Sequence, residues 1–447
     1  MKVVFSVILV FLLGLTVLAG KMMPPPPGGE RIHLVWASDN NPVRQAQVDL
    51  FNKLNPDLYL TIDTDNADQQ KVIVQSIGGV GPDIFSSFGE FALAAYVNSG
   101  IAMDVTDHFA SKGIDVEKMV WPAGIPSSKI GGRTYAFPCN INANAIWFNK
   151  EIFDAEGVPY PKPDWTWEDL IATAKRMTKR DARGKPTRFG LYYDFDWNSL
   201  LLQHGGRAFS EDGTECTIDS PEAIEAFTLA HDLIYKYNVT PSPVQVASIS
   251  TQGGWGSGDI TFFMGGRVAM AWGGRWWLNL MRKDPKSPRC GVVPLPHVRV
   301  NTQIGGARVA MVNSRSKHPK EALRFLEFLA SREYNELIND QADALAPVMK
   351  YCEGPKFDLN PAYPEETYNS IWRDAIKNST TEPVSKFVQG SELAPLNTQL
   401  DLIKSNIKPV KDALRDAKIQ MDERILRTAR IRPSLGKLWT ELKGAQP

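Results

Sequence analysis

The sequence has little cysteine, few histidines and no excess of charge of either sign. Among 447 residues there are 4 Cys and 6 His, and 50 Lys and Arg balance 50 Asp and Glu. A neutral chain lacks the basic surface that releases counterions from a phosphate backbone, so nucleic acid is not an expected partner. No cysteines have CxxC spacing and no histidines are spaced as metal ligands. We therefore expect neither a metal nor a cofactor.

The four cysteines, Cys139, Cys216, Cys290 and Cys352, stand far apart in the chain. Sequence spacing does not determine whether any of them pair as disulfides. Buried free thiols, which pack as small apolar side chains, explain them equally well. Both alternatives stay open at this stage.

Motifs of enzyme catalysis are also missing. The sequence has no GxSxG, HExxH, Walker A or EF-hand pattern, and the glycine-rich stretch Gly254–Gly258 lacks a phosphate-binding lysine. Carboxylates such as Asp83, Glu90, Asp194 and Asp196 would suit a glycosidase if two of them lay about 5–9 Å apart. No motif selects such a pair. The sequence favours a protein that is not an enzyme, with a carbohydrate-active enzyme as the alternative.

The N-terminus of the chain carries an apolar run. Met1 and Lys2 precede residues 3–19, which are almost wholly apolar. This pattern predicts that residues 1–20 are a signal peptide or an N-terminal anchor. Lys21 stands where a bacterial lipoprotein has cysteine, which excludes lipid attachment there. Residues 21–30 form a Pro/Gly linker. These features leave two alternatives. The segment is either cleaved, which gives a freely diffusing protein, or kept as a membrane tether through residues 3–19.

Strands and helices alternate through the remaining chain. Residues 32–36 read as a buried strand, Asn41 and Pro42 as the start of a helix, and residues 59–62 as a second strand, which together make a β-α-β unit. Thr166 to Asp169 has the form of a capping box. The pattern predicts an α/β fold in two lobes. The 12 Trp are expected in cores or in a pocket with flat apolar faces.

Four segments, in order, carry a family resemblance. They are Gly81-Pro82-Asp83-Ile84 with residues 96–100, residues 132–153 with a continuation through Leu170, residues 263–276, and residues 294–322. Together they resemble the family 1 extracellular solute-binding proteins of ABC importers, the maltose- and oligosaccharide-binding group. The resemblance covers roughly residues 31 to 350.

The resemblance implies a two-lobed periplasmic-binding-protein fold of type II. Each lobe would be a mixed, mostly parallel sheet flanked by helices, with the ligand cleft at the hinge. The expected division is residues 31–139 plus 304–345 for the N-terminal lobe, and 140–303 plus 346–447, including a helical tail, for the C-terminal lobe.

The resemblance also implies a function. The protein would capture a sugar or sugar derivative by hinge closure and deliver it to the permease subunits of an ABC importer. It would be a monomer that a bacterium exports to the periplasm or to the extracytoplasmic face of the inner membrane. A membrane-tethered ligand sensor using the same cleft is a further alternative.

Several residues match ligand-contacting positions of the family. Trp276 occupies the aromatic position of a G-x-W turn, where sugars stack, although its cluster with Trp272 and Trp277 is also explained as core. Asn142 follows the first crossing between lobes, where a polar side chain enters the cleft.

Other candidates follow the carboxyl ends of strands, where ligands of open α/β sheets gather. Trp36, Ser38 and Asp39 follow the first strand, and Phe88 and Glu90 follow the strand of the PDI segment. Packing in the core is the alternative for Trp36.

Trp255 and Arg308 complete the set of expected ligand contacts. Asp194, Asp196 and Trp197 have the simplest interpretation as an acidic turn, with a position on the rim of the second lobe as the alternative.

Overall fold

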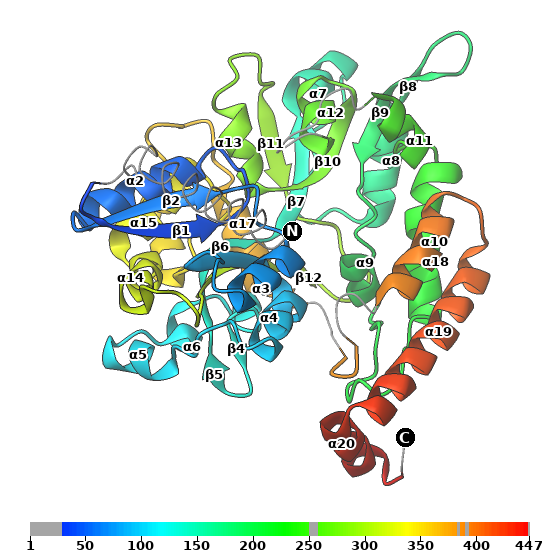
Figure 1. The fold of residues 1–447 in the computed structure, drawn as a ribbon. Coiled ribbons are helices and arrows are strands. Elements are labelled where there is room, and N and C mark those ends of the chain that lie inside the picture. Colours follow the sequence, from blue (N-terminus) through cyan, green and yellow to red (C-terminus); the bar gives the residue numbers. More distant parts are fainter. Residues whose placement is uncertain (1–28, 250–257, 382–384, 389–392, 446–447) are drawn as a thin grey trace, which may run out of the picture.

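The computed structural model describes residues 29–249, 258–381, 385–388 and 393–445. They form two α/β lobes, as Figure 1 shows. The sheet of the first lobe has the order β2-β1-β3-β13-β6. Strand β1 pairs in parallel with β2 and with β3, whereas β13 pairs antiparallel with β3 and with β6. Its strands are β1 (Ile32–Ala37), β2 (Leu58–Asp63), β3 (Ile84–Phe88), β6 (Ala136–Asn142) and β13 (Gly306–Val312).

The sheet of the second lobe has the order β11-β7-β10-β9-β8. Its β10 is parallel to β9 and antiparallel to β7. The strands are β7 (Asn144–Asn149), β8 (Lys179–Arg180), β9 (Pro186–Tyr192), β10 (Val268–Gly274) and β11 (Cys290–Val293). Two short pairs complete the strands: β4 (Lys129–Ile130) with β5 (Arg133–Thr134), and β12 (Gln303–Ile304) with β14 (Ser379–Thr380). The predicted two-lobed α/β fold is confirmed. The prediction that the sheets are mostly parallel is wrong, because two of the four pairings in the first sheet and three of the four in the second are antiparallel.

Helices cover both sheets. Those of the first lobe are α2 (Arg44–Leu54), α3 (Gln69–Ile77), α4 (Gly89–Asn98), α5 (Thr106–Ser111), α6 (Val116–Met119), η1 (Pro122–Gly124), α14 (Pro319–Leu329) and α15 (Arg332–Gln341). Those that follow β7 up to β11 are α7 (Lys150–Glu156), α8 (Trp167–Met177), α9 (Trp197–Gln203), α10 (Pro221–Tyr235), α11 (Pro243–Ile249), α12 (Asp259–Met264), η2 (Arg275–Trp277) and α13 (Leu278–Met281).

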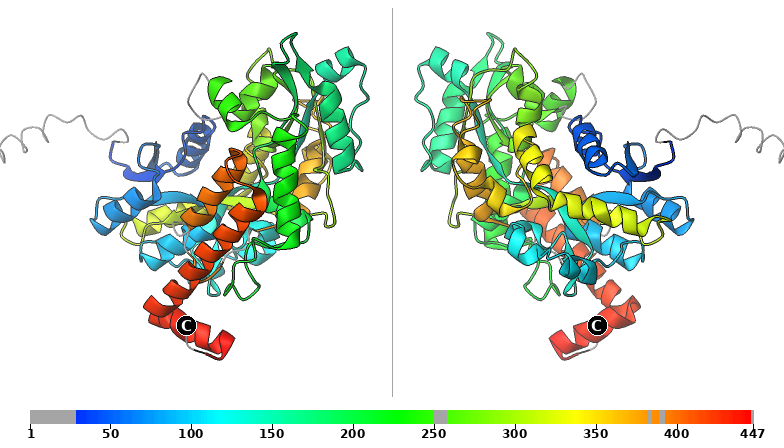
Figure 2. Two further views of the ribbon diagram at one scale, coloured as in Figure 1. Left: turned by 90° about the vertical axis from the view of Figure 1, so that its right-hand side faces the viewer. Right: turned by 90° about the vertical axis from the view of Figure 1, so that its left-hand side faces the viewer.

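The C-terminal part of the chain is helical. Its elements are η3 (Met349–Cys352), α16 (Pro355–Asp358), α17 (Asn369–Lys377), α18 (Ala394–Lys404), α19 (Val410–Ile431) and α20 (Pro433–Lys443). Figure 2 shows α19 running along the outside of the second lobe and α20 projecting beyond it.

The predicted start of α8 is confirmed, whereas α2 begins later than the sequence predicts. Thr166 and Asp169 form a complete capping box at the start of α8. Helix α2 begins at Arg44 rather than at Pro42. Asn41 accepts a hydrogen bond from the Val43 N–H at 3.1 Å, and its amide also donates to Asp343 at 3.3 Å. The side chain expected to cap the helix therefore shapes the turn before it.

The chain passes between the sheets with almost no linker. Strand β6 ends at Asn142 and β7 begins at Asn144, so only Ala143 lies between them. The predicted lobe boundary after Cys139 thus falls inside β6, because Asn140 and Asn142 still pair with β13. This direct crossing brings the ends of the two sheets together.

Most of the tryptophans in the described residues belong to the core. Trp36, Trp121, Trp147, Trp277 and Trp372 are fully buried. The Trp147 and Trp277 rings stack with centroids 5.9 Å apart. Flat apolar faces therefore fill the interior rather than only a pocket.

The four cysteines are free thiols, three buried and Cys290 half-buried. Within the described ranges no helix is long and apolar enough to cross a membrane, and no group of three or more His, Cys, Asp or Glu side chains is arranged to hold a metal. The predicted N-terminal signal peptide or anchor lies outside the described residues.

Gly190 tests the packing of α8 on the second sheet. A Cβ atom at Gly190 would lie 1.9 Å from the Ala174 carbonyl oxygen. We expect Gly190→Ala to lower the free energy of unfolding by about 2–3 kcal/mol, since overpacking forces the backbone apart. Urea denaturation measures this change. The control Thr187→Ala, which alters an exposed side chain of the same strand, should leave stability nearly unchanged; equal stability of both variants would contradict the prediction.

Candidate ligand-binding site

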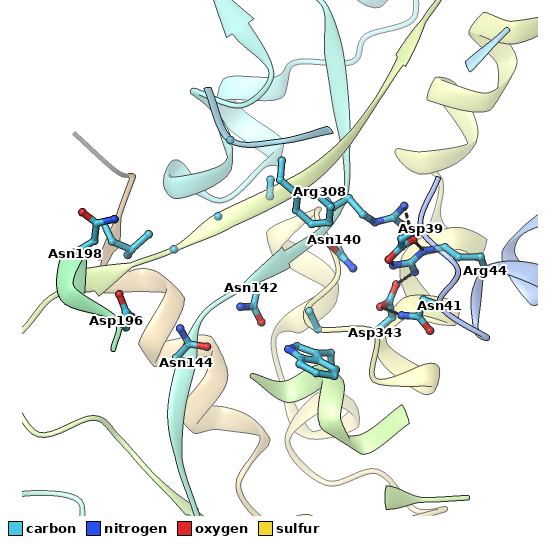
Figure 3. A pocket seen from close by; sticks show the side chains of 18 residues that line it. Asp39, Asn41, Arg44, Asn140, Asn142, Asn144, Asp196, Asn198, Arg308 and Asp343 are labelled. Carbon is cyan, nitrogen blue, oxygen red and sulfur yellow. Dashed lines mark hydrogen bonds and ion pairs between the residues drawn. The ribbon is translucent and has the colours of Figure 1, made fainter. Parts of the chain in front are cut away.

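A cavity of about 500 Å³ lies where the two sheets adjoin. Both lobes contribute to it. Its lining residues are Asp39, Asn41, Arg44, Phe88, Gly89, Asn140, Asn142, Asn144, Asp196, Asn198, Trp276, Ile304, Gly305, Gly306, Ala307, Arg308, Asp343 and Ala344. Figure 3 shows Arg308, Asp39, Arg44, Asn41 and Asp343 at one end, Asp196, Asn198 and Asn144 at the other, and Asn140 and Asn142 between them.

Three asparagines lie along the crossing from β6 to β7, two at the end of β6 and one at the start of β7. Asn140, Asn142 and Asn144 alternate with buried apolar residues, and side chains two apart on an extended chain share one face. Their amides therefore line the cavity while the residues between them enter the core. Among the described residues, the buried Oδ1 of Asn142 has no hydrogen-bond partner. Such an orphaned acceptor is rare in a protein interior and suits a site that a ligand completes.

Arg44 organises the charged end of the cavity. Its side chain is buried, and its Nε and Nη2 donate to the two oxygens of Asp39 at 2.7 and 3.1 Å. Its Nη1 pairs with Asp343. Burial by itself would raise the pKa of Asp39, but Arg308 and Arg44 outweigh this effect and lower it. Asp39 is therefore a fixed carboxylate.

Asp343 is held in a strained turn. Its neighbours Ala342 and Ala344 have φ values of 55° and 61°, a region that costs non-glycine residues about 1–2 kcal/mol each. Arg275 fixes the turn by donating to the Ala344 carbonyl oxygen at 2.7 Å. Gln47 donates to Asp343 at 3.1 Å. Strain that the surroundings enforce in this way is typical of functional sites.

Arg308 lies beside this cluster. Its Nη1 donates to the Ser38 hydroxyl at 2.7 Å and lies 3.6 Å from an Asp39 oxygen. The guanidinium also stands 5.3 Å from the centre of the Trp36 ring. Within the described part of the chain, its buried Nε and Nη2 have no hydrogen-bond partner.

The opposite end of the cavity contains one carboxylate. Asp196 caps α9, accepting hydrogen bonds from the Ser199 N–H at 3.2 Å and from the Ser199 hydroxyl at 2.7 Å. Burial raises the pKa of Asp196, and this outweighs the opposing effect of the Ser199 hydrogen bonds. The neighbouring polar side chain from the same helix is the neutral amide of Asn198.

Two aromatic side chains complete the lining. Phe88 ends β3 and is 63% exposed, and Trp276 is half-buried in η2. Gly274 makes room beside Trp276: a Cβ atom there would lie 2.9 Å from the indole Nε1 and 2.5 Å from Asn142 Oδ1. The absence of a side chain at Gly274 thus lets an aromatic face and an amide approach each other in the cavity wall.

The structure places the predicted site residues in four groups. Trp276, Asn142, Asp39, Phe88 and Arg308 all line the cavity. Ser38 lies behind the wall, where it accepts the hydrogen bond from Arg308. Trp255 falls outside the described residues.

Two further predicted contacts, Trp36 and Glu90, are not in the lining. Trp36 is fully buried: its ring packs 4.9 Å from Phe325 and its N–H donates to the Ser86 hydroxyl at 3.0 Å. The prediction for Trp36 is therefore corrected, because its side chain points from β1 into the core. Glu90 is half-buried on α4 and does not line the cavity.

Other lining residues were not predicted. Those with polar or charged side chains are Asn41, Arg44, Asn140, Asn144, Asn198 and Asp343. The sequence does contain a signal for two of them. Asn140 and Asn144 stand with Asn142 at every second position, which on an extended chain places their side chains on one face. Asp343 had none, because it reaches Arg44 across 299 residues of sequence. Asp196, interpreted as part of an acidic turn, lines the cavity.

Two α/β lobes that adjoin at strand crossings around a polar and aromatic cavity define a protein that encloses a small ligand between its lobes. Residues 37–336 match the family model of the bacterial extracellular solute-binding proteins. The chain belongs to this family, whose members bind solutes outside the cytoplasm.

Individual relatives are distant. An ABC transporter extracellular-binding protein of Pyrococcus horikoshii is 24% identical over 72% of this chain and 69% of its own length. The sn-glycerol-3-phosphate-binding periplasmic protein of Shigella dysenteriae is 23% identical over 84% of this chain and 87% of its own length. Among solved structures, an ABC substrate-binding protein of Listeria monocytogenes in complex with cycloalternan has a TM-score of 0.75 and 23% identity, covering 90% of this chain and all of that one.

Gly274→Ala tests how the cavity wall is assembled. The backbone at Gly274 (φ −94°, ψ 167°) suits alanine, so the added methyl acts through its contacts with Trp276 and Asn142. We expect ligand affinity to fall about tenfold or more with little change in melting temperature, as measured by calorimetric titration and thermal unfolding.

Gly273→Ala is the matched control. Its Cβ atom would lie 2.6 Å from the buried indole of Trp277, so this variant should lose stability while its folded fraction keeps ligand affinity. Unaltered ligand affinity in Gly274→Ala would show that Trp276 and Asn142 are not positioned by this glycine.

Proposed function

We propose that this protein captures a sugar or sugar derivative between its lobes and delivers it to an ABC importer. The observation that carries the proposal is the composition of the cavity. Its lining combines two aromatic side chains, Trp276 and Phe88, with five asparagine amides and three carboxylates from both lobes. Few other ligands need so many hydrogen-bonding groups beside an aromatic face.

The chemistry of a sugar fits this lining. A sugar ring presents an apolar C–H face, which an indole buries, and a rim of hydroxyl groups that both donate and accept hydrogen bonds. An asparagine amide offers one acceptor and two donors, so it satisfies either role of a hydroxyl. A buried hydroxyl partner left unsatisfied costs about 1–3 kcal/mol, which makes the amide array a specificity device.

Closure of the lobes follows from where the contacts lie. Asn140 and Arg308 belong to the first sheet, whereas Asn144, Asp196 and Trp276 belong to the second lobe. A ligand that touches both sides stabilises the closed arrangement by contacts that an open one lacks. A micromolar affinity corresponds to only about 8 kcal/mol, so release to a transporter stays feasible.

We propose that the site is not catalytic. A glycosidase needs one carboxyl group that donates a proton and a second carboxylate beside it. Asp39 and Asp343 both pair with Arg44, and the pKa of Asp39 is lowered, which removes it as a proton donor. Asp196 has a raised pKa, but it lies at the opposite end of the cavity from Asp39 and Asp343, so no second lining carboxylate stands beside it. The tertiary contacts thus favour binding over hydrolysis.

The cellular setting is also part of the proposal. The predicted N-terminal export segment and membership in an extracellular family support export to the periplasm or to the extracytoplasmic face of the inner membrane. We propose a monomer that docks on the permease subunits of an importer. The segment 3–19 would provide a tether where it is not cleaved.

The ligands of relatives support a small polyhydroxylated compound. The similar Listeria protein is described in complex with cycloalternan, and the Shigella relative binds sn-glycerol 3-phosphate. We propose a saccharide for this chain because aromatic Trp276 and the asparagines suit a ring with several hydroxyls.

Thermal unfolding with a panel of neutral saccharides tests the function. A ligand at about 100 times its Kd should stabilise the protein by about 2.7 kcal/mol. We expect at least one saccharide to raise the melting temperature in this way, and Trp276→Ala to weaken its binding about tenfold or more.

Trp439→Ala is the matched control for loss of an indole. Trp439 is half-buried on α20, where it packs against Phe387 far from the cavity in sequence and fold. The Trp439→Ala variant should lower the melting temperature without changing ligand affinity. A panel in which no saccharide shifts the melting temperature would count against sugar binding.

A further inference from the structure

The charged side chains of the cavity are unequally paired. Five lining residues carry a formal charge: Asp39, Arg44, Asp196, Arg308 and Asp343. Three carboxylates thus face two guanidinium groups, which leaves an excess of one negative charge. Figure 3 shows four of these residues gathered at one end and Asp196 alone at the other.

The cations at the crowded end are already engaged. Each nitrogen of the Arg44 guanidinium pairs with Asp39 or Asp343. Arg308 donates from Nη1 to Ser38, and its other two nitrogens are buried against the protein near the Trp36 ring. All three Arg44 nitrogens are therefore engaged. The two Arg308 nitrogens that have no partner among the described residues are shielded from an anion in the cavity, because the Arg308 side chain is only 1% exposed.

Asp196 has no such compensation. The hydrogen bonds to its carboxylate come from Ser199, and among the described residues no Lys, Arg or His side chain lies within 4.0 Å of it. The nearest lining residues at this end, Asn144 and Asn198, are neutral amides. A half-buried carboxylate without a cation attracts hydrogen-bond donors and repels negative charge, all the more when the lobes close and exclude water.

We propose that Asp196 makes the pocket select against phosphorylated and other anionic ligands, and that the bound ligand meets this carboxylate with a hydroxyl or ammonium group. The inference rests on the proposed function and deepens it by assigning the charge class of the ligand. It separates this chain from its relative that binds sn-glycerol 3-phosphate, although the two share a family.

Matched ligand pairs test the charge selectivity. The probes are glycerol with sn-glycerol 3-phosphate, glucose with glucose 6-phosphate, and trehalose with trehalose 6-phosphate, and glucosamine supplies a cationic group. Calorimetric titration at one fixed salt concentration gives each Kd. For any pair that binds, we expect the neutral member to bind at least about tenfold tighter than its phosphate. Binding of glucosamine at least as tight as that of glucose would assign an ammonium donor, and weaker binding a hydroxyl.

Two variants change the charge at this end without changing the fold. Asn caps a helix as well as Asp does, so Asp196→Asn should keep the start of α9. We expect it to reduce the preference for the neutral member of a pair at least threefold. Asn198→Asp adds a second carboxylate at the same end and should increase that preference.

The outcomes distinguish the two proposals. A phosphate that binds wild-type protein as tightly as its neutral partner, or a preference that Asp196→Asn leaves unchanged, overturns the charge inference and leaves sugar binding standing. Binding of a phosphorylated probe where no saccharide binds overturns both. Absence of binding by every probe and every panel saccharide overturns the proposed function and the charge selectivity that rests on it.

Discussion

The buried guanidinium of Arg44 is the interaction on which the ligand cavity depends. It joins Asp39, just after β1, to Asp343, which follows α15 and lies 299 positions beyond Arg44 in the sequence. Removing one partner from a buried ion pair leaves an uncompensated charge, which is far more costly than any gain from the pair itself. The three segments therefore stay together, and they form one wall of the cavity. Asn41 and Gln47 add hydrogen bonds to Asp343 that complete this wall.

Several unfavourable features gather around that network. Ala342 and Ala344 adopt left-handed backbone conformations, and within the described part of the chain Asn142 keeps a buried amide oxygen without a partner. Each is unfavourable alone and persists only because dense packing holds it in place. Their concentration at one cavity marks a surface arranged for a ligand rather than for the stability of the empty protein.

The direct crossing from β6 to β7 gives the cavity its two-sided character. Because a single residue separates the strands, the asparagines of the crossing extend from one lobe to the other, between the Arg44 cluster and Asp196. A ligand lying along them contacts both lobes. This geometry is what couples binding to closure in the proposed mechanism. In the proposed selectivity, Asp196, which has no cationic partner among the described residues, adds a preference for ligands without negative charge.

The sequence by itself determined the class of fold and much of the cavity. Hydrophobic periodicity and cap residues such as Thr166 act within one turn of chain, so they can be read locally. Four ordered motifs carried the family resemblance, which in turn implied Trp276 and Asn142 as cavity residues. Only the tertiary structure decided that Trp36 is core, that Asp343 meets Arg44, and that Asp196 faces the ligand space. Whether a side chain at the end of a strand enters the core or the cavity depends on the helices that pack over it. Those contacts come from residues hundreds of positions away, which no local pattern records.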